Sequence, residues 1–202
     1  MKILVLALSL ISLNSFAQTA GKPFQLNPGR YTFECWSSHV GNSTNQGKFQ
    51  TDRDVSYAFG STTVVQQGEF FVEVEQGQSI DGDFKDVFSS VSKTIFVDLG
   101  NGQFKRQDES DSSSQAENGE VLNSHSKSEV ILNVDGNKSQ NLLVTNDNQP
   151  QKAGVGESNW MRMSDGRIVT QMYLREKTVR EPNGNRFESL VGNSTCVYTP
   201  QK

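Results

Sequence analysis

The stretch Tyr31–Trp36 (Tyr-Thr-Phe-Glu-Cys-Trp) decides the predicted fold, because it alternates like a β-strand and carries one of only two cysteines in the chain. The other, Cys196, lies in a similar run near the far end. In an exported protein, two cysteines are expected to form one structural disulfide; a catalytic or metal-binding thiol is the alternative. Antiparallel pairing through Cys35 and Cys196 places Phe33 opposite Tyr198. The first and last strands are therefore predicted to be neighbours.

The N-terminus has the pattern of a cleavable secretory signal. Lys2 precedes an apolar run over residues 3–13, and Ser15-Phe16-Ala17 supplies the small residues that a signal peptidase recognises. The run is shorter than the roughly 20 residues that a membrane-spanning helix needs, so no stable membrane anchor is expected. We therefore predict a signal peptide at 1–17, an N-terminal extension at 18–28 and a single domain at 29–202. The expected location is periplasmic or extracellular.

Strand-like alternation continues through most of the chain after Pro28. Faces of the type Val55-x-Tyr57-x-Phe59 and Phe70-x-Val72-x-Val74 recur, and turn residues separate them. Asn-Gly and Asp-Gly pairs supply the positive φ angles of tight hairpins. Hairpin turns are expected at Asp135-Gly136, Asp165-Gly166, Asn183-Gly184 and residues 99–102.

Two segments interrupt this pattern. Phe84, Val87, Phe88 and Val91 recur at helical spacing, so the sequence predicts a short amphipathic helix at about 82–91. Residues 107–119 contain Asp, Glu, Ser, Gln and Asn with no large apolar side chain, which is typical of a long polar loop. Residues 146–156 are similar.

The predicted fold is all-β. The hairpins indicate an antiparallel meander, which fits an up-and-down barrel of about 8–10 strands with one short helix, similar in architecture to lipocalins. A two-sheet β-sandwich is the alternative. The disulfide favours the barrel, because closure through the first and last strands removes two exposed sheet edges. The likeness to lipocalins is architectural only, since their short Gly-x-Trp signature is absent.

Few patterns in the chain point to chemistry. The two histidines have no cysteine or histidine at ligand spacing, so no metal site is expected. We expect no cofactor, no catalytic residues and no enzymatic activity, because no base and nucleophile form a recognisable pair. The net charge of −4 argues against a nucleic-acid partner.

The main functional prediction is an exported, soluble, non-enzymatic binding protein that holds a small, partly apolar ligand. Candidate wall residues are Trp36, Trp160 and Tyr57, with His39 at the mouth of the barrel; each could instead belong to the core or a loop. The partner would be a small ligand or another protein. A protein-interaction or inhibitor module that uses exposed loops is the alternative. An outer-membrane barrel is a third possibility, although the strands carry little of the expected aromatic belt.

Overall fold

The computed structural model describes residues 21–45, 48–82, 84–146, 152–180 and 186–202, with side chains described at 21–42, 49–82, 84–141, 156–175 and 191–202. The predicted signal peptide at 1–17 lies outside the described residues. The structure consists of ten long strands: β1 (Gly29–Asn45), β2 (Lys48–Gln67), β3 (Phe70–Asp81), β4 (Phe84–Gly100), β5 (Gln103–Ala116), β6 (Val121–Asp135), β7 (Lys138–Asn146), β8 (Lys152–Arg162), β9 (Ile168–Arg180) and β10 (Arg186–Pro200).

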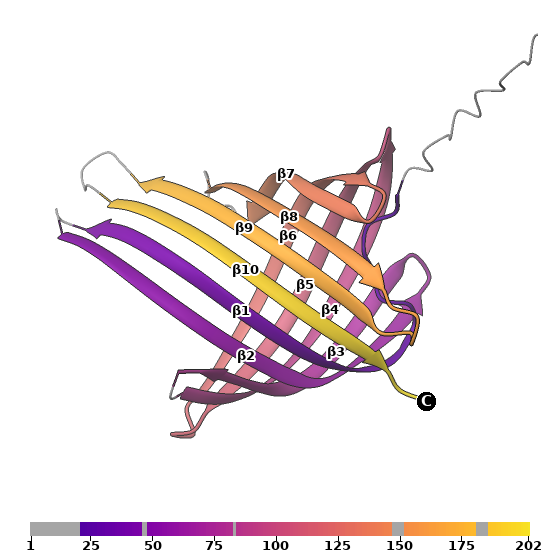
Figure 1. Cartoon of the computed structure of the whole chain (residues 1–202), viewed down its shortest axis with the longest axis horizontal. Coiled ribbons are helices and arrows are strands. Elements are labelled where there is room, and N and C mark those ends of the chain that lie inside the picture. The colour runs from indigo at the N-terminus through magenta and orange to yellow at the C-terminus, as the bar shows by residue number, and fades with distance from the viewer. Residues whose placement is uncertain (1–20, 46–47, 83, 147–151, 181–185) are drawn as a thin grey trace, which may run out of the picture.

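The strands form one closed antiparallel barrel in which each strand pairs with its neighbours in sequence (Figure 1). The ring closes where β1 pairs with β10, so every strand has a partner on both sides. Closure satisfies backbone donors and acceptors that an open sheet would leave at its edges. The predicted up-and-down barrel is therefore confirmed, and the sandwich alternative is excluded.

The register at the closing seam matches the one expected from the cysteines. Cys35 lies directly opposite Cys196, and Phe33 lies opposite Tyr198. The two aromatic rings are 6.4 Å apart between centroids. The disulfide joins two residues that are 161 positions apart, and it uses both cysteines of the described part of the chain. Both the predicted disulfide and the predicted cross-strand pair are confirmed.

The hairpin turns use the expected residues. Asn101 has a φ of 55° between Gly100 and Gly102, in the turn that joins β4 to β5. Asn tolerates this left-handed region better than most residues. The Asp135-Gly136 and Asp165-Gly166 turns are also present, with φ of 59° at Gly136 and 88° at Gly166. The fourth predicted turn, Asn183-Gly184, lies outside the described residues.

The predicted helix at 82–91 is wrong, because β4 begins at Phe84 and pairs with β3 and β5. The helical spacing arose because this strand carries apolar side chains on both faces. Phe88 points into the barrel, where its ring lies 6.3 Å from that of Phe33, whereas Val87 and Val91 point outward and are exposed. A strand with two apolar faces loses the alternation that distinguishes it from a helix.

The predicted loop at 107–119 is also wrong through most of its length, because β5 extends to Ala116. Its backbone pairs with β4 on one side and with β6 on the other. The turn follows only at 117–120. Neither face of β5 carries large apolar residues beyond Phe104, so the sequence gives no hydrophobic signal there. The second predicted loop, 146–156, also shortens, since β8 begins at Lys152.

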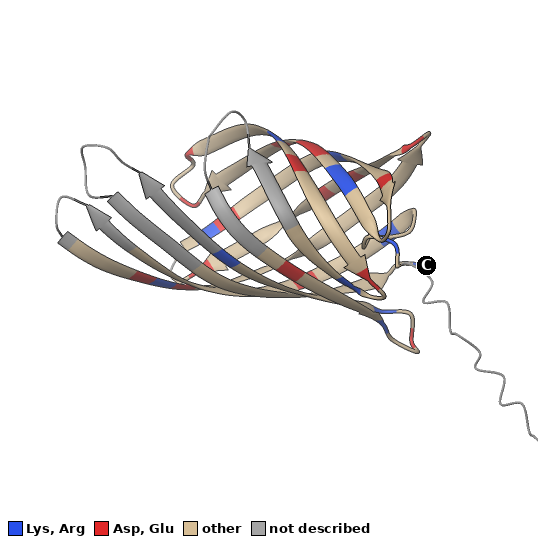
Figure 2. Ribbon diagram, turned by 90° about the horizontal axis from the view of Figure 1, so that it is seen from above, with Lys and Arg blue, Asp and Glu red and all other residues tan. Residues whose placement is uncertain are grey.

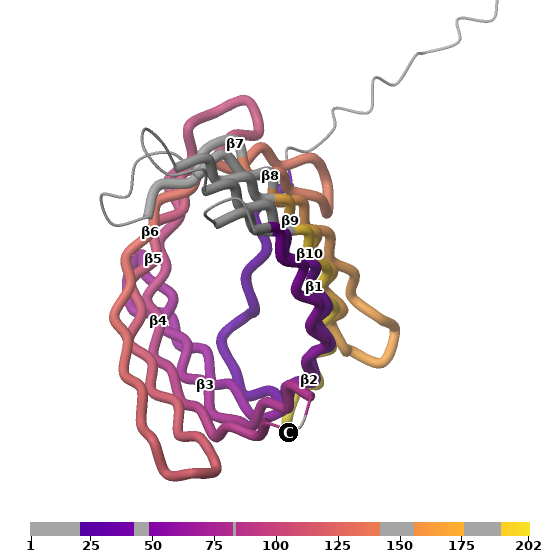
Figure 3. Tube along the Cα trace, turned by 90° about the vertical axis from the view of Figure 1, so that its left-hand side faces the viewer, coloured from indigo at the N-terminus to yellow at the C-terminus, as the bar shows by residue number. Residues whose placement is uncertain are grey.

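The core occupies one end of the barrel interior, near the β2–β3, β4–β5, β6–β7 and β8–β9 turns. Residues 21–28 contain no strand or helix, and Figure 3 shows this indigo segment inside the ring of strands. Leu26 is 2% exposed and packs with Tyr31, Val64 and Ile168. A second inward cluster consists of Phe104, Val130, Leu132 and Val134. The predicted N-terminal extension is therefore part of the core where it is described.

Candidate functional site

The apolar part of the interior is filled by side chains. Phe24 lies 5.9 Å from Trp160 and 6.4 Å from Tyr198 between ring centroids, so the N-terminal segment spans this part of the barrel. Glycines make room for other rings: a Cβ at Gly77 would lie 3.0 Å from Phe88 and 3.2 Å from Phe33. Among the described residues, side chains therefore occupy the part of the interior where an apolar ligand would bind.

The structure separates the four predicted ligand-binding residues. Trp36 and Tyr57 lie opposite each other on β1 and β2, and both point outward, with ring centroids 5.5 Å apart. Trp160 points inward and packs against Phe24. His39 also points inward, where its Nε2 is 2.7 Å from a carboxylate oxygen of Asp54. The predicted set therefore does not line one common ligand cavity.

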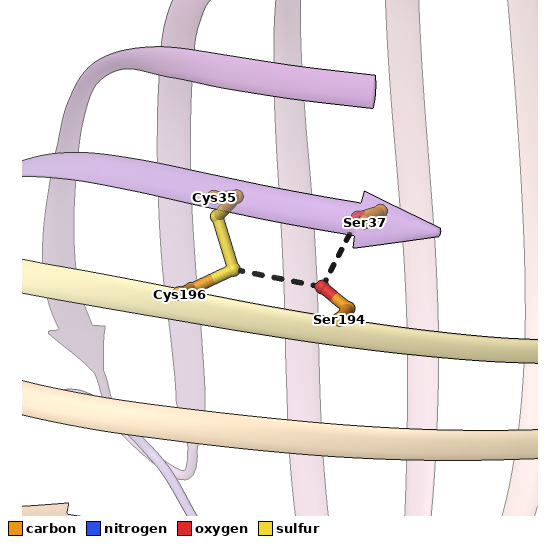
Figure 4. The surroundings of a disulfide bond; sticks show 4 residues. All are labelled: Cys35, Ser37, Ser194 and Cys196. Atoms are coloured by element: carbon orange, nitrogen blue, oxygen red, sulfur yellow. Dashed lines mark hydrogen bonds between the residues drawn. A yellow bond between two sulfur atoms is a disulfide. The ribbon is translucent and has the colours of Figure 1, made fainter. Parts of the chain in front are cut away.

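The disulfide lies on the inner face of the seam (Figure 4). Next to it, the Ser37 hydroxyl donates a hydrogen bond of 3.2 Å to Ser194. The Ser194 oxygen is 4.0 Å from the sulfur of Cys196. The disulfide therefore lies at a boundary along the seam, with the aromatic core at Phe33 on one side and the polar inner wall at Ser37 and Ser194 on the other.

Serine side chains cover much of the inner wall away from the core. On β5 and β6, Ser110 contacts Ser126 at 2.9 Å and Ser112 contacts Ser124 at 2.7 Å between hydroxyl oxygens. Serine is small and satisfies its hydroxyl across the strand pair, so this wall does not need an apolar filling. The open end of the interior is therefore polar, and it suits water better than an apolar ligand.

Two acidic side chains lie inside the barrel on β3. Burial raises the pKa of Glu75 to about 7, and the negative charge of Glu73 contributes to the same shift. Burial also raises the pKa of Glu73, although a 2.8 Å hydrogen bond from the Thr62 hydroxyl opposes this effect. Burial, with smaller contributions from these carboxylates, raises the pKa of the Tyr198 hydroxyl. The folded barrel therefore favours the protonated form of Glu75.

We predict that alkaline conditions weaken the fold through Glu75. When folding raises the pKa of a carboxyl group, that group stabilises the folded state. The contribution to the free energy of unfolding is complete below the unfolded-state pKa and is lost as the pH rises through the folded-state pKa. The free energy of unfolding should fall between pH 5 and pH 8, and Glu75→Gln should reduce the fall by roughly 2 kcal/mol. Urea unfolding at both pH values measures this. The exposed Glu69→Gln is the matched control, and an unchanged slope in Glu75→Gln would refute the prediction.

The outer face of β1–β4 is rich in exposed apolar side chains. Val55 is 73% exposed and Val87 57% exposed, and the ring of Trp36 forms part of an aromatic row with Tyr57 and Phe59. The outward apolar side chains of β1–β4 are called the apolar outer surface below. Its exposed members are Trp36, Val40, Val55, Val65, Val74, Val87, Val91 and Val97. Soluble monomers rarely expose so many apolar side chains on one side.

The outer face of β5 and β6 has the opposite character. It carries ionisable side chains that pair across the two strands, and long stretches of other strands are free of charge in Figure 2. Burying such pairs in lipid would be costly. The pairs are Lys105 with Glu129 at 2.9 Å, Lys127 with Glu109 at 2.9 Å and His125 with Asp111 at 2.8 Å. The barrel therefore has two chemically different outer sides.

The sequence alone did not reveal the apolar outer surface. The signal was present in β4, where the outward Val87 and Val91 produced the apparent helical spacing.

Within the described residues, no group of three or more acidic, histidine or cysteine side chains is placed to hold a metal ion. No helix among those residues is long and apolar enough to cross a membrane.

Comparison with known proteins gives a likeness of fold only. No family model and no curated protein matches the chain. The chain is similar to the crystal structure of Neisserial surface protein A (NspA), with 10% identity over 84% of this chain and 98% of that one and a TM-score of 0.28. It is also similar to Pseudomonas aeruginosa OpdL, with 6% identity over 85% of this chain and 98% of that one and a TM-score of 0.23.

The main functional prediction, a soluble protein that holds a small apolar ligand, is wrong. The filled interior removes the expected cavity, and Trp36 and Tyr57 point away from it. The error arose because alternation along a strand does not say which of its two faces points into a barrel.

Proposed function

We propose that this protein is a non-enzymatic β-barrel of the cell envelope that attaches to a lipid membrane through its apolar outer surface. The observation that carries the proposal is the exposure of Trp36, Val55 and Val87 on the outside of a barrel whose core is already filled. Transfer of apolar side chains from water to lipid is favourable by about 25 cal/mol for each Å² removed from water.

The charge distribution favours attachment on one side. Lys85 and Lys93 lie among the apolar residues of β4, and the ammonium group of Lys93 is 3.8 Å from the centre of the Phe70 ring. Long basic side chains at an apolar surface can reach lipid phosphates while their stems remain in the apolar layer. On the next strands around the barrel, β5 and β6, the charged pairs oppose contact with lipid. The proposed membrane contact is therefore lateral: the outer side of β1–β4 meets the lipid, and the outer side of β5 and β6 does not.

The two tryptophans provide a direct test, because Trp36 points outward and Trp160 points inward. The single-tryptophan variants Trp160→Phe and Trp36→Phe are mixed with vesicles that contain phosphatidylglycerol and brominated phosphatidylcholine. Bromine quenches indole emission only at short range. We expect strong quenching of Trp36 and little quenching of Trp160. Equal quenching of both residues, or none of Trp36, would refute the lateral contact.

A charge placed in the apolar outer surface should release the protein. The double variant Val55→Asp, Val87→Asp replaces two exposed side chains, and it should lower vesicle binding at least tenfold, since two apolar contacts are lost and two negative charges are added. Vesicle flotation measures the bound fraction. Asn123→Asp on the outer face of β6 is the matched control and should bind as the original protein does. Equal loss in both variants would indicate a general charge effect and contradict the proposal.

A further inference from the structure

A hollow of about 660 Å³ crosses five adjacent strands, β6–β10, on the side of the barrel opposite the apolar outer surface. Three of these strands, β8, β9 and β10, lie side by side in Figure 1. The register shows that most of its lining side chains point outward, because they alternate with inward residues such as Trp160 and Cys196. Six of them define what is called the amide groove below: Asn133, Gln140, Asn159, Gln171, Asn193 and Tyr173.

The amide groove is ordered by strand pairing. Asn193 lies opposite Tyr173, and Asn133 lies opposite Gln140. Tyr173 pairs in turn with Glu157, and Glu157 pairs with Gln140, so these five residues form one row across the five strands. With strands about 4.8 Å apart, such a row is roughly 19 Å long. That length accommodates an extended chain of several small units.

The hydrogen-bonding groups of the groove are available to a ligand. Among the described residues, the side chains of Asn133, Asn159, Gln171 and Asn193 form no hydrogen bond, and Gln140 forms a long one of 3.3 Å to Glu157. A primary amide has two N–H donors and one oxygen acceptor at fixed geometry. Neighbouring hydroxyl groups of a sugar ring offer the complementary donors and acceptors. On the outer face of β5 and β6, by contrast, polar side chains pair with one another and are not available to a ligand in the same way.

The remaining features select among polar ligands. Tyr173 is 40% exposed, lies second from the β10 end of the row, and offers an aromatic face to the C–H groups of a sugar ring. The charged residues in the lining are Asp135, Glu157 and Lys138, so the groove is not basic. A groove without an excess of cations gives a polyanion no electrostatic advantage. The charges of the groove therefore do not favour an anionic ligand.

We propose that the amide groove binds a neutral, extended oligosaccharide, with Tyr173 stacked on one ring and the amides bonded to its hydroxyl groups. The site is independent of the proposed membrane contact, because the two occupy different sides of the barrel. A protein that fails to bind vesicles would still bind the oligosaccharide. Loss of oligosaccharide binding would likewise leave vesicle binding intact.

The test is a nuclear magnetic resonance titration of the ¹⁵N-labelled protein with cellohexaose, chitohexaose and maltohexaose, and with an oligogalacturonate as the anionic comparison. We expect at least one neutral hexasaccharide to shift the side-chain amide resonances of Asn159 and Gln171. Tyr173→Ala should lower its affinity about tenfold, because the stacked face is lost, and Tyr173→Phe should retain it. Tyr57→Ala, on the other side of the barrel, should bind as the original protein does.

Several outcomes would overturn the assignment. One is the absence of any shift with all three neutral sugars at millimolar concentration. Another is binding of the anionic oligosaccharide alone. A third is unchanged affinity in both Tyr173→Ala and Asn159→Leu. Thermal unfolding of each variant is measured in parallel, so that a loss of binding in a folded protein is distinguished from a loss of fold.

Discussion

Replacing both cysteines, Cys35→Ala and Cys196→Ala, is expected to lower the free energy of unfolding by about 4 kcal/mol. The disulfide closes a loop of 161 residues, so its removal frees nearly the whole barrel in the unfolded state. It also joins β1 to β10, the two paired strands that are farthest apart in sequence. Urea unfolding under non-reducing conditions, followed by circular dichroism, measures the change.

The neighbouring serine pair provides the control for this prediction. Ser37 and Ser194 lie opposite each other on the same two strands, next to the disulfide (Figure 4). The double variant Ser37→Ala, Ser194→Ala removes one side-chain hydrogen bond and should cost about 1 kcal/mol. If the cysteine variant loses no more than the serine variant, the disulfide contributes little to closure and the prediction fails.

The second large effect is expected at Leu26. Leu26→Ala should lower the free energy of unfolding by about 3 kcal/mol, because the side chain is 2% exposed and its loss leaves a cavity inside the barrel. The residue belongs to a segment without regular structure, where such a cost is unusual. It arises because residues 21–28 fold back into the barrel and pack on Tyr31, Val64 and Ile168. Thermal and urea unfolding measure the loss.

The contribution of the inserted segment can be separated from general effects at the N-terminus. Lys22→Ala changes an exposed residue of the same segment and should alter stability by less than about 0.5 kcal/mol. A hydrophobic dye should bind more strongly to Leu26→Ala than to the original protein, because the variant opens an apolar cavity. Equal stability of the two variants would contradict the packing of Leu26 in the core.

The sequence predicted the barrel where strands have one apolar and one polar face. Tyr31, Phe33 and Cys35 alternate with Thr32 and Glu34, and they share the inner face of β1. The prediction failed at β4 and β5 for opposite reasons. Val87 and Val91 add a second apolar face to β4, and β5 beyond Phe104 has no large apolar face at all. In both strands, pairing with two neighbours outweighs the local pattern.

The candidate sites show the same limit. Trp36 and Tyr57 were identified as interacting residues, yet the sequence placed them inside the barrel and the structure places them outside. The amide groove was not identified at all. Its members come from five strands. Asn133 and Asn193, for example, are 60 positions apart in sequence, and only the strand register brings them into one row.

By itself, the sequence determined the all-β class, the turns and the closing pair of strands, because period-two alternation, Asn-Gly or Asp-Gly turns and two cysteines act through local backbone geometry and a single covalent bond. Only the tertiary structure decided what lies inside and outside. The orientation of a strand whose two faces are alike depends on its neighbours, and the place of residues 21–28 depends on a cavity that exists only once the ring has closed.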